Sequence, residues 1–226
     1  MLARRERALW AIAALSLVLV GACYVLVRAF GPLPGELRFE AWRVDGGYPD
    51  AWDRPLTFVT YLGDTWVAVA SVLLLAVVAA EEAGRRAAVP ILAAAGSPIV
   101  AEVLSAALGP TSQEYNGAAG VNLGTGDNFP SGHAAYAVSV FGVAAWLAFE
   151  RGHRALAGAL AVPVALMGPA LAILGNHYPA DLLAGYALGL AWAIGVLLVG
   201  ERRASRPGLP EHPRRGSGPG LPRRPR

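Results

Sequence analysis

Apolar residues are grouped along the chain in blocks of about twenty, which is the length that a helix needs to cross the hydrocarbon of a bilayer. Short polar segments with charged residues, glycine or proline separate these blocks. We predict one membrane-spanning helix for each block, with the limits Ala8–Val27, Pro55–Ala80, Ala87–Leu108, Ser131–Phe149, Ala155–Leu174 and Pro179–Val199. The pattern therefore predicts an all-α membrane protein, a six-helix bundle over residues 1–200.

The composition agrees with this pattern, because 55% of the residues are hydrophobic and only 15% are charged. Soluble domains carry about 25% charged residues, so a soluble enzyme is excluded. Arginines precede the first apolar block, as they do in a signal peptide. The block is longer than a typical signal core and no small-residue cleavage site follows it, so we expect it to be retained as the first span.

Two polar segments differ in character from the short turns. The segment Gly31–Arg54 is predicted to be a loop whose Trp42, Tyr48 and Trp52 rest at the membrane interface. The tail, residues 201–226, contains mainly arginine, proline and glycine, so we expect it to be disordered and to be attracted to anionic lipid. Because no aromatic residues alternate with its arginines, we expect no nucleic acid partner.

The distribution of arginine predicts the orientation, since cytoplasmic loops carry an excess of basic residues. All basic residues are arginine, and they gather at the N-terminus, in the turns 81–86 and 150–154, and in the tail. With six spans these segments share one side, so both termini are expected in the cytoplasm of a multi-pass cell-membrane protein. The segments 31–54, 109–130 and 175–178 then face outward together.

The first candidate motif, Pro130-Ser131-Gly132-His133, lies where an outward segment meets the fourth block. A helix start offers unpaired N–H groups and a positive dipole end to a phosphate. Gly132 would let an anion approach the backbone, Ser131 could cap the helix or donate a hydrogen bond, and His133 could protonate a departing oxygen. The same four residues would also be found if Ser131 were only an N-cap and His133 only a residue at the membrane interface.

The second candidate motif, His177-Tyr178-Pro179-Ala180-Asp181, precedes the sixth block. Proline suits the first turn of a helix, so Asp181 should lie in that turn with His177 just before it. The carboxylate could then fix the imidazole tautomer and leave the other ring nitrogen free as a nucleophile or a base. A polar cap on a loop would look similar.

These two motifs, in this order, resemble those of the type 2 phosphatidic acid phosphatase superfamily, whose core is shared by vanadium haloperoxidases. The resemblance covers about residues 55–200 and includes Leu62-Gly63-Asp64 and Ala184-Gly185. Members are six-helix membrane enzymes that remove phosphate from lipid phosphates and prenyl pyrophosphates without a metal, so no cofactor is expected.

The resemblance also implies roles for individual residues. His177 would attack phosphorus and form a phosphohistidine, Asp181 would orient it, and His133 would be the general acid. The residues expected to bind the substrate are Ser131, Gly132, Asn128 and Glu102.

The chain departs from the family pattern at the positions that bind phosphate. The first family motif is Lys-x6-Arg-Pro, and alignment on Pro110 puts Glu102 at the lysine position and Gly109 at the arginine position. The third motif should begin Ser-Arg, where this chain has Ala170-Leu171. All three cationic ligands are missing from their usual places, and such groups normally stabilise the phosphoryl transition state.

Three interpretations remain open. In the first, the protein is an active phosphatase in which an arginine at the outward end supplies the charge; the candidates are Arg28, Arg38, Arg43 and Arg54. In the second, a divalent cation is held by the two histidines and by the carboxylates of Glu102, Glu114, Asp127 and Asp181, although the spacing matches no known site. In the third, the protein binds a lipid headgroup or assists a partner enzyme without turnover. We favour hydrolysis because His133, His177 and Asp181 are present together.

Two further features lead to packing predictions. Gly185-x3-Gly189 resembles a close helix-packing motif, which we expect to act inside the bundle. Asp64 lies in the outer half of the second apolar block, and a pairing with an outer-loop arginine is expected.

Overall fold

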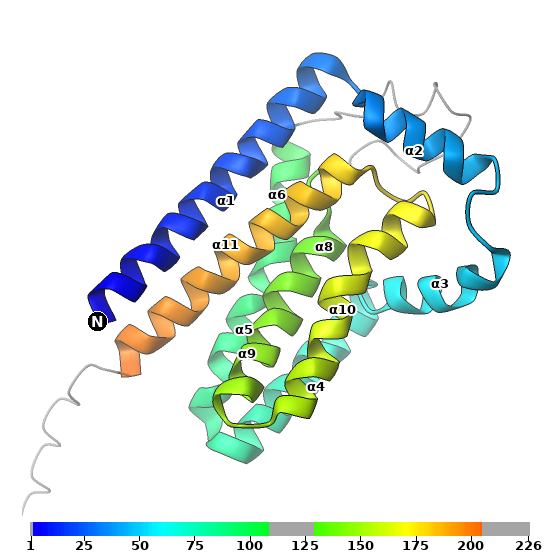
Figure 1. Ribbon diagram of the computed structural model, residues 1–226. Coiled ribbons are helices and arrows are strands. Elements are labelled where there is room, and N and C mark those ends of the chain that lie inside the picture. The colour runs from blue at the N-terminus through cyan, green and yellow to red at the C-terminus, as the bar shows by residue number, and fades with distance from the viewer. Residues whose placement is uncertain (1, 109–128, 205–226) are drawn as a thin grey trace, which may run out of the picture.

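Six apolar helices run through the molecule and make it a multi-pass, all-α membrane protein (Figure 1). The computed structural model describes residues 2–108 and 129–204, and these ranges contain helices and turns but no strand. The candidate spans are Arg4–Phe30, Thr65–Ala83, Arg85–Leu108, Gly132–Glu150, Arg154–Ile173 and Pro179–Arg202. Each overlaps one predicted block, so the predicted fold class is confirmed.

The described residues form the following helices in chain order. The elements are α1 Leu2–Phe30, α2 Pro34–Val44, η1 Asp50–Trp52, α3 Asp53–Tyr61, α4 Thr65–Ala83, η2 Arg85–Ala87, α5 Ala88–Ala94, α6 Gly96–Leu108, α8 Gly132–Tyr136, the π-helical segment η3 Ala137–Phe141, α9 Gly142–Glu150, α10 Arg154–Ile173 and α11 Pro179–Ala204. The fourth span is the continuous run α8–η3–α9, and the third is η2, α5 and α6.

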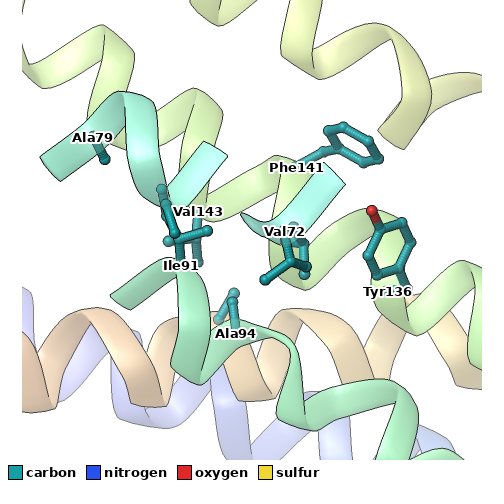
Figure 2. Packing of buried hydrophobic residues seen from close by; sticks show 10 residues of the cluster. Val72, Ala79, Ile91, Ala94, Tyr136, Phe141 and Val143 are labelled. Atoms are coloured by element: carbon teal, nitrogen blue, oxygen red, sulfur yellow. The ribbon is translucent and has the colours of Figure 1, made fainter. Parts of the chain in front are cut away.

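The fourth span forms the centre of the bundle. Its residues Tyr136, Val140 and Val143 are buried, and they pack with Val72 of α4 and Ile91 of α5 (Figure 2). Large apolar side chains on α1 and α4 are instead exposed, as expected for helices that face lipid.

Close contact between α8 and α11 depends on two glycines. A methyl group on Gly185 would lie 2.5 Å from the Ser131 carbonyl oxygen, and one on Gly189 would lie 2.5 Å from the Ala135 carbonyl oxygen. Small residues let membrane helices approach at this distance. The predicted role of Gly185-x3-Gly189 in packing inside the bundle is therefore confirmed.

Buried polar side chains find partners within the bundle. The Ser97 hydroxyl donates to the Ala135 carbonyl at 3.1 Å and pairs with the Ser139 hydroxyl at 2.6 Å. The Tyr186 hydroxyl accepts from Gly168 N at 2.7 Å and donates to the Val164 carbonyl at 2.9 Å. Tyr186 thereby occupies one rung of the hydrogen-bond ladder of α10, next to a proline that lacks an N–H, Pro169.

The segment between the first two spans is not the loop that the sequence analysis predicted. It contains the helix α2, which begins with Pro34 in its first turn, and Glu36 accepts the Leu33 N–H at 2.9 Å. Proline restrains the first turn of a helix as readily as a loop, and glutamate near a helix start accepts an otherwise unpaired N–H. The prolines and glycines were therefore wrongly interpreted as loop signals throughout.

The predicted second span, Pro55–Ala80, is also wrong in its first third. The turn Leu62–Asp64 divides it into α3 and α4, and α3 packs beside α10 rather than continuing the span (Figure 1). Of these two helices, only α4 is long and apolar enough to cross the membrane.

The sixth helix continues beyond its predicted end at Val199 to Ala204, so Glu201–Ala204 is helical rather than disordered. Ion pairs join this end to the start of α1, where Arg5 contacts Glu201 and Arg202 contacts Glu6. The disorder and lipid attraction predicted for the rest of the tail concern residues 205–226, which lie outside the described part of the chain.

The packing of Gly185 predicts a measurable difference between two alanine substitutions on α11. Gly185→Ala would push a methyl group into Ser131 and Ala134, and overpacking of this kind costs about 1–3 kcal/mol. Gly195→Ala is the matched control, because nothing lies within 4 Å of the added methyl group. Chemical unfolding in detergent micelles should show a lower midpoint for Gly185→Ala alone; equal midpoints would contradict the described packing.

Candidate active site

The two candidate motifs meet at one end of the bundle, where α8 and α11 begin (Figure 1). The Ser131 N–H donates to the backbone carbonyl of Asp181 at 3.1 Å, which joins the first motif directly to the second. The prediction that both motifs lie at one end is therefore confirmed. Two histidines far apart in the sequence are brought close enough for their charges to interact, His133 and His177.

His177 and Asp181 form a buried pair at the start of α11. His177 Nδ1 lies 3.7 Å from Asp181 Oδ2, and the two side chains are 10% and 9% exposed. The same carboxylate oxygen accepts the Tyr178 N–H at 3.3 Å, so Asp181 holds the loop as well as facing the ring. Nδ1 has no hydrogen-bond partner within the described residues. Because the Asp181 carboxylate faces Nδ1, Nε2 is the ring nitrogen that remains available for reaction.

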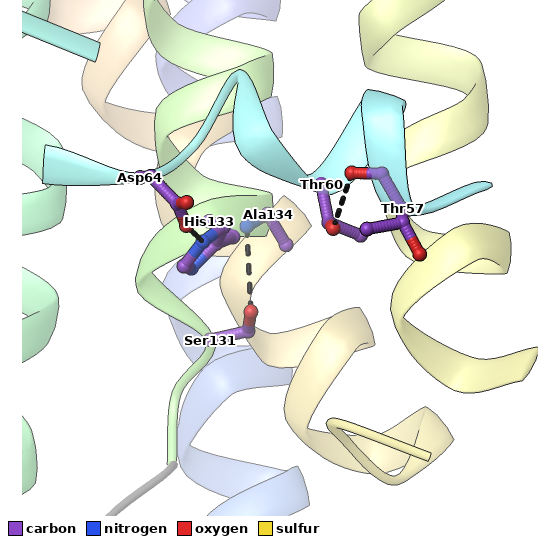
Figure 3. A network of polar contacts seen from close by, with 6 residues as sticks. All are labelled: Thr57, Thr60, Asp64, Ser131, His133 and Ala134. Carbon is purple, nitrogen blue, oxygen red and sulfur yellow. Dashed lines mark hydrogen bonds and ion pairs between the residues drawn. The ribbon is translucent and has the colours of Figure 1, made fainter. Parts of the chain in front are cut away.

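His133 lies in the first turn of the fourth span and is more accessible, with 33% of its side chain exposed. Its Nε2 lies 3.5 Å from Oδ1 of Asp64, in the turn between α3 and α4 (Figure 3). The predicted pairing of Asp64 with an outer-loop arginine is therefore wrong: in the described part of the chain, the ionic partner of Asp64 is His133.

Ser131 acts as the N-cap of α8. Its hydroxyl oxygen accepts the Ala134 N–H at 3.3 Å, and the residue is fully buried (Figure 3). The hydroxyl hydrogen can still donate, but the cap accounts for the serine without any ligand. Asn128, which the sequence analysis assigned to substrate binding, lies outside the described residues.

A carboxylate takes the place that the resemblance gives to lysine. Glu102 extends from α6 toward the start of α8, and its Oε1 would lie 3.6 Å from a methyl group on Gly132. Glu102 is also close enough to His133 for their charges to interact. A carboxylate therefore lies beside the first motif, at the position where the family pattern has a lysine.

One of the four candidate arginines lies against the loop that leads into the second motif. The guanidinium of Arg43 in α2 packs on Gly175, where an added methyl group would lie 2.7 Å from its Cζ. Only 12% of the Arg43 side chain is exposed, whereas Arg28, Arg38 and Arg54 are exposed. Arg43 donates to Glu40 from Nε at 2.8 Å, and this pairing raises the pKa of Arg43, so the guanidinium stays charged.

The helix α2 contributes a second carboxylate to this end of the bundle. Glu36 is buried, and its Oε1 accepts the Ala180 N–H in the first turn of α11 at 2.7 Å. Burial raises the pKa of Glu36, and the nearby Asp181 carboxylate adds to this effect. The sequence analysis missed Glu36. A glutamate shortly after a helix-starting proline indicates only a local role at the helix start, and it does not reveal a hydrogen-bond partner 144 residues away.

The metal interpretation receives no support from the described residues, among which no group of three or more histidine, cysteine or acidic side chains could hold an ion. Two of the ligands proposed from the sequence, Glu114 and Asp127, lie outside the described part of the chain.

Comparisons with known proteins agree with this geometry. Residues 104–205, which include both motifs, match the family described as the PAP2 superfamily. A solved structure with a similar fold is that of a transmembrane PAP2-type phosphatidylglycerolphosphate phosphatase from Bacillus subtilis. The TM-score is 0.66 at 18% identity, over 85% of this chain and 95% of that chain, so this likeness concerns the fold. No match was found among the curated proteins. Over residues 104–205 the chain carries the sequence pattern of the PAP2 superfamily, on the fold of a membrane PAP2 phosphatase, and the resemblance inferred from the motifs is confirmed.

Proposed function

We propose that the protein hydrolyses a phosphate monoester or a pyrophosphate on a membrane lipid, through a phosphohistidine at His177. The observation that carries this proposal is the Ser131–Asp181 hydrogen bond, which sets the two motifs side by side. A buried His177–Asp181 pair then lies near a more accessible His133, and a structural role requires neither arrangement.

The chemistry divides between the two histidines. The free nitrogen of His177 attacks phosphorus, the bond from phosphorus to the lipid oxygen breaks, and the electron pair leaves on that oxygen. His133 gives its proton to the leaving oxygen, so that the lipid departs as a neutral alcohol. A water molecule then attacks the phosphohistidine, His133 takes its proton, and inorganic phosphate is released as His177 regains its free nitrogen. Asp181 orients the ring and stabilises its positive charge.

We propose that Arg43 supplies the positive charge that the family motifs lack. Its guanidinium lies against Gly175, two residues before the nucleophile, and its charge is maintained by the Glu40 pair. Backbone N–H groups at the start of α8 would add further donors to the phosphate oxygens. Because Arg43 shares its donors with Glu40, it is a weaker substitute than three free cations, and we expect slow turnover.

We also propose that the site faces outward and that both termini are cytoplasmic. The ion-paired ends of α1 and α11 lie together, opposite the site, and the arginine-rich turns belong to their side of the bundle (Figure 1).

The interpretation without turnover keeps one supporting observation, the carboxylate of Glu102 beside Gly132 where a cation would be expected. In that case the site binds a lipid headgroup without hydrolysing it.

Phosphate release by the purified protein from a panel of prenyl and glycerolipid phosphates separates these functions. The wild type should release phosphate from at least one substrate. His177→Ala should lose the activity, and His133→Ala should retain about 1% or less, because general acid–base catalysis contributes about 10²–10⁴-fold. If all three proteins match the blank across the panel, hydrolysis is excluded and binding to vesicles containing the same lipids becomes the measurement of interest.

Substitution of Arg43 tests the source of positive charge. Arg43→Gln should lower kcat/KM by about tenfold to a hundredfold, somewhat less than the loss of a free oxyanion-stabilising donor, because the charge is partly neutralised by Glu40. Arg43→Lys should recover part of the loss. Arg38→Gln, on the exposed side of the same helix, is the matched control and should remain active. Full activity of Arg43→Gln would remove this residue from the site.

Reporter fusions test the orientation. A cytoplasm-dependent fluorescent reporter on the C-terminus should be active, and a cysteine introduced at the exposed Asp50 should react with a membrane-impermeant thiol reagent on intact cells. The reverse pattern would place the site on the inner face.

A further inference from the structure

Asp64 stands at the N-cap position of α4 but does not cap the helix. Its backbone has the extended conformation of an N-cap, with φ −64° and ψ 138°, and its carbonyl accepts the Ala68 N–H at 2.7 Å. Its side chain makes no hydrogen bond to the N–H groups of the first turn. An aspartate at this position usually stabilises the helix by about 1 kcal/mol through that bond. The carboxylate is turned to His133 instead.

The residue before it, Gly63, provides the surface on which the imidazole rests. A methyl group at this position would overlap the ring of His133 at Cδ2 and Cγ, so only glycine leaves room for the ring. Two consecutive residues of one turn therefore contact His133: Gly63 packs against the ring, and the Asp64 carboxylate pairs with its Nε2. This pairing gives a role to Gly63 and Asp64, which take no part in the proposed reaction itself.

Three titratable groups face His133 from the elements around it: Asp64 from the α3–α4 turn, Glu102 from α6, and His177 from the loop before α11. Among them, Asp64 is the one within hydrogen-bond reach, at 3.5 Å. Its side chain is 52% exposed, whereas Asp181 in the other histidine pair is 9% exposed. Of the two histidine–aspartate pairs, the pair at His133 is thus the more open to solvent.

We propose that Asp64 is the positioning residue of the general acid, and that Gly63-Asp64 holds the imidazole of His133 in place until the proton is delivered. The carboxylate contacts Nε2, so the ring presents its other nitrogen, Nδ1, to the leaving oxygen of the lipid. A nearby negative charge favours the imidazolium, which is the form that can donate. The catalytic part of this proposal rests on the proposed function; the pairing of the two side chains does not.

Kinetics of Asp64→Asn test the catalytic part. Asparagine is as good an N-cap as aspartate, so α4 should form normally while the charge is lost. We expect kcat to fall by about tenfold with little change in KM, because the acid is then held less well in place while the lipid still binds. The alkaline limb of the kcat profile should move about 0.5–1 unit to lower pH, because the imidazolium loses its counter-charge. Asp64→Glu should recover part of the rate, and Asp50→Asn, an exposed acid at the same end of the bundle, is the matched control.

Titration of His133 by NMR tests the pairing without any need for turnover. Protein labelled on histidine gives four imidazole signals, and His133→Gln assigns the one in question. In Asp64→Asn the titration midpoint of His133 should move about 0.5–1 unit to lower pH, while that of His153, at the other end of the bundle, stays unchanged. An unmoved His133 midpoint would overturn the proposal. A moved midpoint with unchanged kcat and pH profile would overturn its catalytic part. If the wild type hydrolyses no lipid phosphate, the proposed function fails, and the titration still decides whether Asp64 holds His133.

Discussion

A single backbone hydrogen bond, from the Ser131 N–H to the Asp181 carbonyl, fixes the relation between the two helices that carry the histidines. It can form only because Gly185 lets α8 lie directly on α11, where a methyl group would meet the Ser131 carbonyl. The positions of His133 and His177 follow from this contact, since His133 lies two residues after Ser131 and His177 lies four residues before Asp181. The chemistry at the mouth of the bundle therefore depends on close packing one turn below it.

The features that could be predicted from the sequence are those set by local patterns. Apolar blocks long enough to cross a bilayer have one stable form in lipid, the helix, because its backbone groups are satisfied internally. Pro179 in a first turn and Ser131 as a cap also act locally, so the beginnings of the fourth and sixth spans could be located. The placement of both motifs at one end then followed from the number of spans alone.

The features that escaped prediction depend on partners distant in the sequence. The helix α2 has the composition of a loop, and it is held to the bundle by Glu36 on Ala180 and by Arg43 on Gly175. Asp64 has the pattern of an ordinary helix cap, yet its partner is an imidazole on another helix. We propose that residues of this kind supply the charge that the family motifs lack. No alignment with the motifs could reveal them, because they come from a different part of the chain.

The Tyr186 hydroxyl, which occupies a rung of the α10 ladder, has a consequence for the short loop above it. Because both of its hydrogen bonds go to the backbone of α10, this tyrosine of α11 prevents the two helices from sliding along each other. The loop that contains His177 is short, because α10 ends at Ile173 and α11 begins at Pro179. Both ends of this loop are therefore fixed relative to each other. A histidine on so short a connection is ordered by the two helices that flank it, and the Tyr186 hydroxyl inside the bundle keeps those helices in register.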